Sequence, residues 1–261
     1  MSRTVLTMVV VIVSSTASAQ DGFHAYEYEG YTDTPLIPGS TFKVHQRDRP
    51  QPPRVEVPPA APESAKPPSD AIVLFDGSST DRFTGAVWEV RDGALVAGDG
   101  NLQTQDAFGD CQLHVEWRAP DPPSGPPVNM GNSGVFMMGF YEIQVYDSYS
   151  SRIYADGSAA AIYGQTPPLA NACREPGEWQ TYDIIFTAPV FEDGGLVRLG
   201  AVTMLHNGVL VHNGTKLLGA TAHRAAPSYT PHASRLPIVL QGHGSPVEYR
   251  NIWLRELQPT E

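Results

Sequence analysis

The sequence predicts an all-β protein in which two antiparallel sheets pack face to face, preceded by an irregular N-terminal arm. About a dozen short stretches alternate apolar and polar residues between turn signals, which is the spacing of a β-sandwich. Gly and Pro each occur 24 times in 261 residues, and both disfavour helix interiors. No long window repeats apolar residues with the helical period. A single sandwich of about 200 residues would account for most of the chain.

Residues 1–19 have the parts of a secretory signal peptide. Arg3 gives a basic start, an apolar run covers residues 5–13, and the small residues Ala17, Ser18 and Ala19 precede the expected cleavage. The apolar run is too short to span a membrane. We therefore expect a secreted or periplasmic protein with no integral membrane segment after signal removal.

Residues 20–70 show no regular period and are expected to form an arm and a Pro-rich linker. Tyr31, Phe42 and His45 are the side chains expected to hold the first part against the domain. The Pro-rich part that follows predicts a looser, extended chain.

The sandwich domain is expected over residues 71–258. The dipeptides Asp92-Gly93 and Asn207-Gly208 each lie between two apolar runs, which predicts tight hairpins. The long segment 148–176 is expected to be a loop, with a short strand at 159–163 as one option, and it predicts a lid or a pocket wall. Strands are predicted within 71–77, 88–96, 102–105, 111–118, 135–138, 141–146, 177–186, 201–206, 209–211, 237–241 and 247–257.

Three of these strands carry polar faces. Period-two geometry places Glu142, Gln144 and Tyr146 opposite Ile143 and Val145. An ordinary half-exposed strand would show the same pattern, but its recurrence suggests that the polar faces share one ligand-binding surface. The polar positions of the other two strands are Gln112, His114, Glu116 and Arg118, and Gln241, His243, Glu248 and Arg250.

Charge and cysteine content narrow the function further. The net charge of −11, with no Lys or Arg cluster, argues against nucleic-acid binding, which needs a basic face. An oxidising compartment permits a disulfide between Cys111 and Cys173, which would stabilise the fold by about 4 kcal/mol. Two buried free thiols are an equal expectation.

From about Ile72 to Leu257 the chain resembles the 3-keto-disaccharide hydrolase domain family. The resemblance rests on eight motifs in order, each weak alone: LFDG (74–77), WEVRDGALVA (88–97), GDCQLHVEWR (109–118), GNSGVF with YEIQVYDSY (131–149), AIYG (161–164), PGEWQTYDI (176–184), LHNGVLVHN (205–213) and LQGHGSPVEYRNIWLREL (240–257). It implies a concanavalin A-like sandwich, or jelly roll, and an enzyme acting on carbohydrates oxidised to a ketone at carbon 3.

That ketone acidifies the proton on carbon 2, so a base can remove it and the group on carbon 1 can leave by β-elimination; water then adds, giving net hydrolysis. Such a reaction needs a base, an acid and a group that holds the enolate. We nominate His243 and Glu142 as base and acid, and Arg250 to hold the enolate. A divalent metal bound by His243 with Glu142 or Asp147 is the other option for the enolate.

Further candidate pocket residues are Asn132, Gln144, Tyr163, Glu178, Trp179, Gln241, Glu116 and His114. For His243 a structural role in a turn is the alternative. The chain also departs from many relatives, with Gly242 where they carry Asp and Phe140 where they carry Arg. A non-catalytic lectin-like carbohydrate-binding module, with Trp179, Tyr146 and Tyr163 stacking on sugars, is therefore the competing hypothesis, and a cell-surface scaffold domain is a third.

Overall fold

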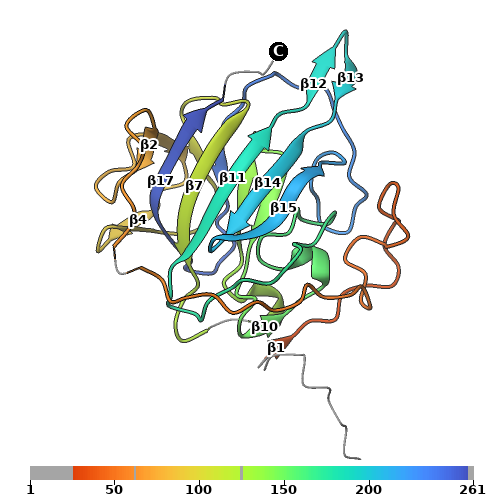
Figure 1. Ribbon diagram of the computed structural model, residues 1–261, viewed down its shortest axis with the longest axis horizontal. Helices are drawn as coiled ribbons and strands as arrows, with labels where there is room; N and C mark the ends of the chain where they lie inside the picture. Colours follow the sequence, from red (N-terminus) through yellow and green to blue (C-terminus); the bar gives the residue numbers. More distant parts are fainter. Residues whose placement is uncertain (1–25, 62, 124–125, 258–261) are drawn as a thin grey trace, which may run out of the picture.

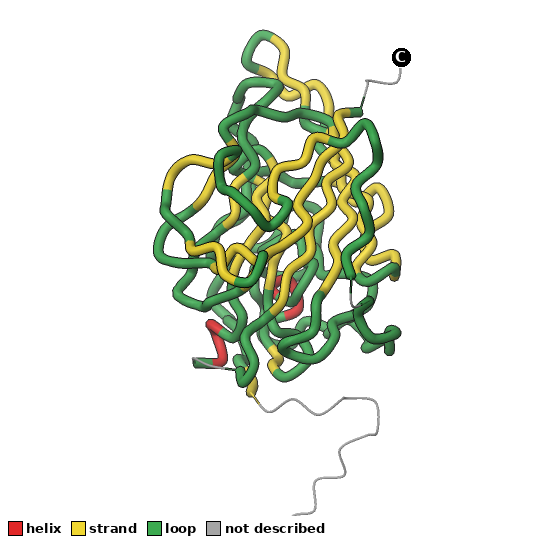
Figure 2. Tube along the Cα trace, turned by 90° about the vertical axis from the view of Figure 1, so that its left-hand side faces the viewer, coloured by secondary structure: helices red, strands yellow, loops and turns green. Residues whose placement is uncertain are grey.

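The computed structural model describes residues 26–61, 63–123 and 126–257, so the predicted signal peptide lies outside the described residues. The all-β prediction is confirmed: strands joined by long loops run through the body of the molecule in Figure 2, and the helical segments of the described chain are two short 3-10 turns, η1 (Pro127–Asn129) and η2 (Ala155–Gly157). Neither of them is long and apolar enough to cross a membrane.

Two antiparallel sheets form a concanavalin A-like sandwich (Figure 1). The larger sheet has eight strands in the order β15-β14-β11-β7-β17-β5-β4, with β2 also paired to β17, and the smaller has the order β3-β6-β16-β8-β9. The large-sheet strands are β2 (Ile72–Phe75), β4 (Glu89–Arg91), β5 (Ala94–Val96), β7 (Cys111–Arg118), β11 (Gln180–Thr187), β14 (Ala201–His206), β15 (Val209–Lys216) and β17 (Glu248–Glu256). The small-sheet strands are β3 (Phe83–Gly85), β6 (Leu102–Thr104), β8 (Ser133–Met137), β9 (Tyr141–Val145) and β16 (Val239–Leu240).

The core lies between the sheets and follows the period-two pattern. On β7, Leu113, Val115 and Trp117 are fully buried, and on β9 so are Ile143 and Val145; all belong to one apolar cluster. Burying each such aliphatic side chain stabilises the fold by roughly 1.5–3 kcal/mol. The residues between them therefore point to the outer faces of the sandwich.

The two predicted hairpin turns are confirmed. Asp92-Gly93 and Asn207-Gly208 have positive φ at both residues, with 51° and 74° in the first and 53° and 81° in the second, which is the type I′ geometry that matches strand twist. A further hairpin, β12 (Val190–Glu192) with β13 (Gly195–Arg198), projects from the body in Figure 1. Its turn, Asp193-Gly194, carries the same signal, which the sequence prediction overlooked.

The arm packs along the sandwich. The short strand β1 (Tyr26–Glu27) pairs with β10 (Ser151–Arg152). The Pro-rich segment has no regular structure, yet it is tied down: the Ser64 hydroxyl donates to Glu116 on the large sheet, and Asn251 of β17 donates to the Ala65 carbonyl.

The polar strands do not share one surface, which corrects the sequence prediction. Glu142 points from the outer face of the small sheet, whereas Glu116 and Arg250 pair across β7 and β17 on the outer face of the large sheet. The core separates the two faces. Cys111 and Cys173 are both buried and free, so the expectation without a disulfide is the one observed.

Candidate active site

The outer face of the small sheet brings together one group of the predicted site residues. Glu142 lies opposite Phe136, and Gln144 opposite Gly134, across β8 and β9. The backbone amide of Gln241 donates to the Gly134 carbonyl at 3.0 Å, which continues the pairing of β16 with β8. Glu142, Gln144 and Gln241 therefore lie on one face, as their period-two positions require.

Gly134 leaves the floor of this face open. A Cβ atom at position 134 would lie 2.5 Å from Glu142 Oε1 and 2.9 Å from Phe136 Cε2, closer than non-bonded atoms approach. The Glu142 carboxyl group thus occupies the space above Gly134, beside an aromatic ring. A side chain larger than hydrogen would push it away from the sheet.

Glu142 is the most strongly perturbed acid of this face. It is 5% exposed, and burial raises the pKa of its carboxyl group to about 8, because desolvation disfavours the charged form. Among the described residues, no side chain donates a hydrogen bond to this carboxyl group. At neutral pH Glu142 is therefore mostly protonated and can act as a proton donor.

The long loop after β9 forms a wall of the site. Ile162 bridges Ile143, and the Tyr163 amide donates to the Glu142 carbonyl at 3.1 Å, so the Tyr163 side chain emerges next to Glu142 on the outer face. The Tyr163 hydroxyl lies 3.0 Å from Nδ1 of His223 and 2.8 Å from the Tyr154 hydroxyl.

A second wall follows the turn η1. Gln144 Nε2 donates to Asn132 Oδ1 at 3.1 Å, and Nδ1 of the exposed His243 lies 2.8 Å from Asn129 Oδ1. With the Asn129 oxygen accepting the proton of Nδ1, the lone pair of His243 is on Nε2. Asn129 thereby fixes His243 in the tautomer that a base requires.

The departures from the family pattern have distinct structural settings. A Cβ atom at Gly242 would collide with the backbone carbonyl oxygens of Gly98 and Gly100, so this backbone has no room for the Asp of many relatives. Phe140 is 40% exposed and stacks on His232 with ring centroids 5.2 Å apart.

The other group of predicted residues forms a cluster on the large sheet. Burial lowers the pKa of His114, but hydrogen bonds with Asp183 and Glu116 outweigh it and raise the pKa to about 9. Burial raises the pKa of Glu116, but its bonds with His114, Asn251, Arg250 and Ser64 outweigh this and lower it to about 2.

The same cluster leaves few groups free for a ligand. Arg250 donates to Glu116 at 2.6 Å, and its guanidinium lies 4.1 Å from the centre of the Trp179 ring. A groove of about 380 Å³ runs between this cluster and the arm. Because the charged groups already pair with one another, the cluster mainly fastens the arm to the sheet.

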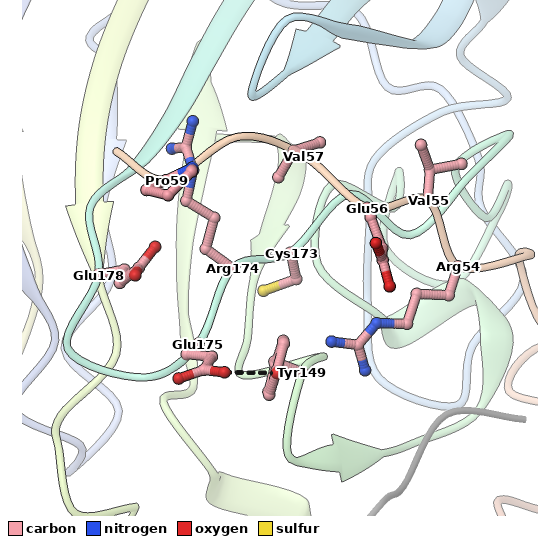
Figure 3. Close-up of a pocket in the computed structure, with 10 residues that line it drawn as sticks. All are labelled: Arg54, Val55, Glu56, Val57, Pro59, Tyr149, Cys173, Arg174, Glu175 and Glu178. Carbon is pink, nitrogen blue, oxygen red and sulfur yellow. Dashed lines mark hydrogen bonds between the residues drawn. The ribbon is translucent and has the colours of Figure 1, made fainter. Parts of the chain in front are cut away.

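Glu178 lies in a third place, a groove of about 250 Å³ beneath the arm (Figure 3). Arg54 lies over the Tyr149 ring at 3.9 Å, and the Tyr149 hydroxyl donates to Glu175 at 2.6 Å. Glu178 is therefore separated from Glu142, which the sequence prediction had placed in the same pocket.

Asp147, one of the residues proposed for a metal, has a structural role. Asp147 Oδ1 accepts the backbone amides of Tyr149 and Ser150 at 3.1 and 3.0 Å, so it caps a turn. Within the described ranges, no three His, Cys, Asp or Glu side chains are grouped to hold a metal ion. Tyr146 is also fully buried and donates to the Pro127 carbonyl, so it cannot stack on a sugar.

The sequence prediction overlooked His223 and the role of Tyr31. His223 lies in the irregular segment between β15 and β16, and Tyr31 belongs to the arm. In neither place does a periodic pattern predict the direction of a side chain. Yet the Tyr31 hydroxyl lies 3.2 Å from Nε2 of His223. The arm thus contributes directly to the wall beside Glu142.

Comparison with known proteins agrees with the fold. A candidate glycosyl hydrolase from Parabacteroides distasonis is 44% identical, with a TM-score of 0.70 over 72% of this chain and 84% of that one. Another protein from the same organism, also described as a candidate glycosyl hydrolase, is 21% identical, with a TM-score of 0.53 over 72% of this chain and 99% of that one. A comparison with curated proteins found no match.

The family comparison agrees with the motifs quoted above. Residues 70–255 match the family defined by the 3-keto-alpha-glucoside-1,2-lyase-like domain, and this match covers most of the sandwich and begins after the arm. The chain therefore belongs to the 3-keto-alpha-glucoside-1,2-lyase-like domain family.

Proposed function

We propose that the chain is a carbohydrate-active enzyme that cleaves 3-keto-glycosides by elimination and hydration, and that the site is the small-sheet face around Glu142. Family membership and the 44% identical candidate glycosyl hydrolase support the general class. The observation that carries the reaction type is the buried Glu142, a proton donor at neutral pH, together with His243, which Asn129 of the second wall holds with its Nε2 lone pair free. The predicted signal peptide leads us to propose a secreted or periplasmic location.

The reaction proceeds in two halves. His243 Nε2 removes the proton from carbon 2, and the electrons of that C–H bond form the enolate of the carbon-3 ketone. The enolate then expels the oxygen on carbon 1, which takes the proton of Glu142 and leaves as an alcohol. A water molecule adds to carbon 1 of the resulting enone and gives its proton to Glu142, while protonated His243 returns a proton to carbon 2.

Release of the alcohol from 3-keto-glucosides of both anomers tests this proposal. We expect release by the purified mature protein and a loss of at least about 100-fold in kcat in Glu142→Gln and in His243→Ala, because each variant removes one proton-transfer group. Glu178→Gln, which alters a carboxylate of the separate groove, serves as the matched control and should retain full activity.

The competing lectin hypothesis is judged in the same experiment. Saturable binding of unoxidised oligosaccharides without turnover of any 3-keto-glucoside would support the binding module and contradict the enzyme. In that case Gly242 and Phe140, the two departures from the family pattern, would be the first positions to exchange.

A further inference from the structure

We propose that Tyr163 is the catalytic group that holds the enolate oxygen, and that Tyr31 of the arm positions it through His223. This inference rests on the proposed function and supplies the enolate-stabilising group for which Arg250 had been nominated. Arg250 lies on the opposite face of the sandwich, bound to Glu116. Tyr163 emerges on the same face as Glu142 and is only partly buried.

The hydrogen bonds of the arm determine which partner donates the proton at each step from Tyr28 to His223. The Tyr28 hydroxyl donates to the Tyr31 hydroxyl at 3.0 Å, so the single proton of Tyr31 is directed to Nε2 of His223, 3.2 Å away. Burial lowers the pKa of His223, which keeps its ring neutral. A neutral ring that accepts at Nε2 carries its proton on Nδ1.

The consequence appears at Tyr163. The Nδ1 proton of His223 is donated to the Tyr163 hydroxyl oxygen at 3.0 Å, and the Tyr154 hydroxyl can donate to the same oxygen at 2.8 Å. With both partners donating, the proton of Tyr163 is free for a substrate oxygen. Burial also raises the pKa of Tyr163, so the hydroxyl remains a donor throughout the working pH range.

The arm is held where this relay needs it. Arg224, the neighbour of His223, donates to both carboxylate oxygens of Asp33 at 2.9 Å, and its guanidinium lies 4.3 Å from the centre of the Tyr31 ring. The His45 ring packs against two tyrosines of the relay: its centroid lies 4.0 Å from that of the Tyr154 ring and 4.7 Å from that of the Tyr163 ring. The residues that match the family, 70–255, include His223, Tyr154 and Tyr163, whereas Tyr28 and Tyr31 precede them.

Kinetics on 3-keto-glucosides test the inference. Tyr163→Phe should lower kcat by about 100-fold with little change in KM, as loss of one donor to a developing oxyanion does. Tyr31→Phe should lower kcat by about 10-fold, and the double variant should be no slower than Tyr163→Phe alone, because both changes act on one hydroxyl. Glu29→Gln is the matched control: it removes an exposed carboxylate of the arm that pairs with Arg47, outside the relay, and should leave kcat unchanged.

A readout independent of turnover separates this inference from the proposed function. Nitrogen-15 NMR of the imidazole rings should show His223 protonated on Nδ1 in the wild type and in Glu29→Gln, and shifted toward Nε2 protonation in Tyr31→Phe. Wild-type His223 protonated on Nε2, or equal effects of Glu29→Gln and Tyr31→Phe on kcat, would overturn the relay. If the wild type does not turn over 3-keto-glucosides but His223 shows the expected tautomers, the proposed function is overturned and the hydrogen-bond relay still stands.

Discussion

At the scale of single residues, the environment of Glu142 determines its chemistry more than its identity does. Glu116 and Glu142 are both 5% exposed, yet donors around Glu116 lower its pKa to about 2, whereas burial alone raises that of Glu142 to about 8. Only Glu142 can therefore deliver a proton at neutral pH. Of these two carboxyl groups, Glu116 is an ion-pair partner and Glu142 is the acid that we propose.

The raised pKa of Glu142 makes a prediction about stability. Between the ordinary glutamate pKa of 4.5, which applies to the unfolded chain, and the folded value of about 8, the folded state binds more protons than the unfolded state. The free energy of unfolding should therefore fall as pH rises through this window, by at most about 1.4 kcal/mol per pH unit. Urea titrations at four pH values across this window measure the free energy of unfolding of the wild type and of Glu142→Gln. As pH rises, the wild type should lose stability relative to Glu142→Gln; a difference that does not change with pH would contradict the raised pKa.

At the scale of elements, turns explain why the strands were predictable. Asp92-Gly93 and Asn207-Gly208 place residues that tolerate positive φ where a type I′ turn requires them, so the hairpins follow from local sequence. The partners of each strand in its sheet are set by distant residues, and no signal within residues 248–256 places β17 beside β7.

The Asn207 turn should be costly to lose because its side chain does more than permit the turn. Its oxygen accepts from the Thr181 amide at 2.8 Å, and its amide donates to the Ala172 carbonyl at 2.8 Å and to Gln180 at 2.7 Å. We expect Asn207→Ala to lower the free energy of unfolding by about 3 kcal/mol. Asp193→Ala, at the exposed turn of the projecting hairpin, should cost about 1 kcal/mol; equal losses in urea unfolding would refute this difference.

At the scale of the whole molecule, the sandwich divides the candidate residues into two faces. Period two correctly predicted that Glu142 and Gln144 point away from Ile143, because that relation is local. It also suggested that Glu116 and Arg250 join them, which is wrong, because a strand's own sequence does not state which sheet it enters. The contribution of Tyr31 was likewise out of reach, since the arm has no period from which a direction could be derived.

This division predicts that stability and activity respond separately. Arg250→Met leaves Glu116, whose side chain is 7% exposed, without its closest cation, so the free energy of unfolding should fall by about 2 kcal/mol. Because Arg250 lies across the core from Glu142, kcat/KM on 3-keto-glucosides should stay within twofold of the wild type. A large loss of kcat/KM in the folded variant would place Arg250 in the active site after all.

The most direct test of the account is proton removal at carbon 2. The mature protein is incubated with a 3-keto-glucoside in deuterium oxide, and the 3-keto-sugar product is analysed at early times for deuterium on carbon 2. His243 is exposed, so the proton that it takes from carbon 2 exchanges with solvent before a proton is returned. Elimination followed by hydration therefore predicts one deuterium at carbon 2 for each alcohol released by the wild type, and both events at least about 100-fold slower in Glu142→Gln. Release of the alcohol with hydrogen fully retained at carbon 2 would contradict the account and indicate direct hydrolysis at carbon 1.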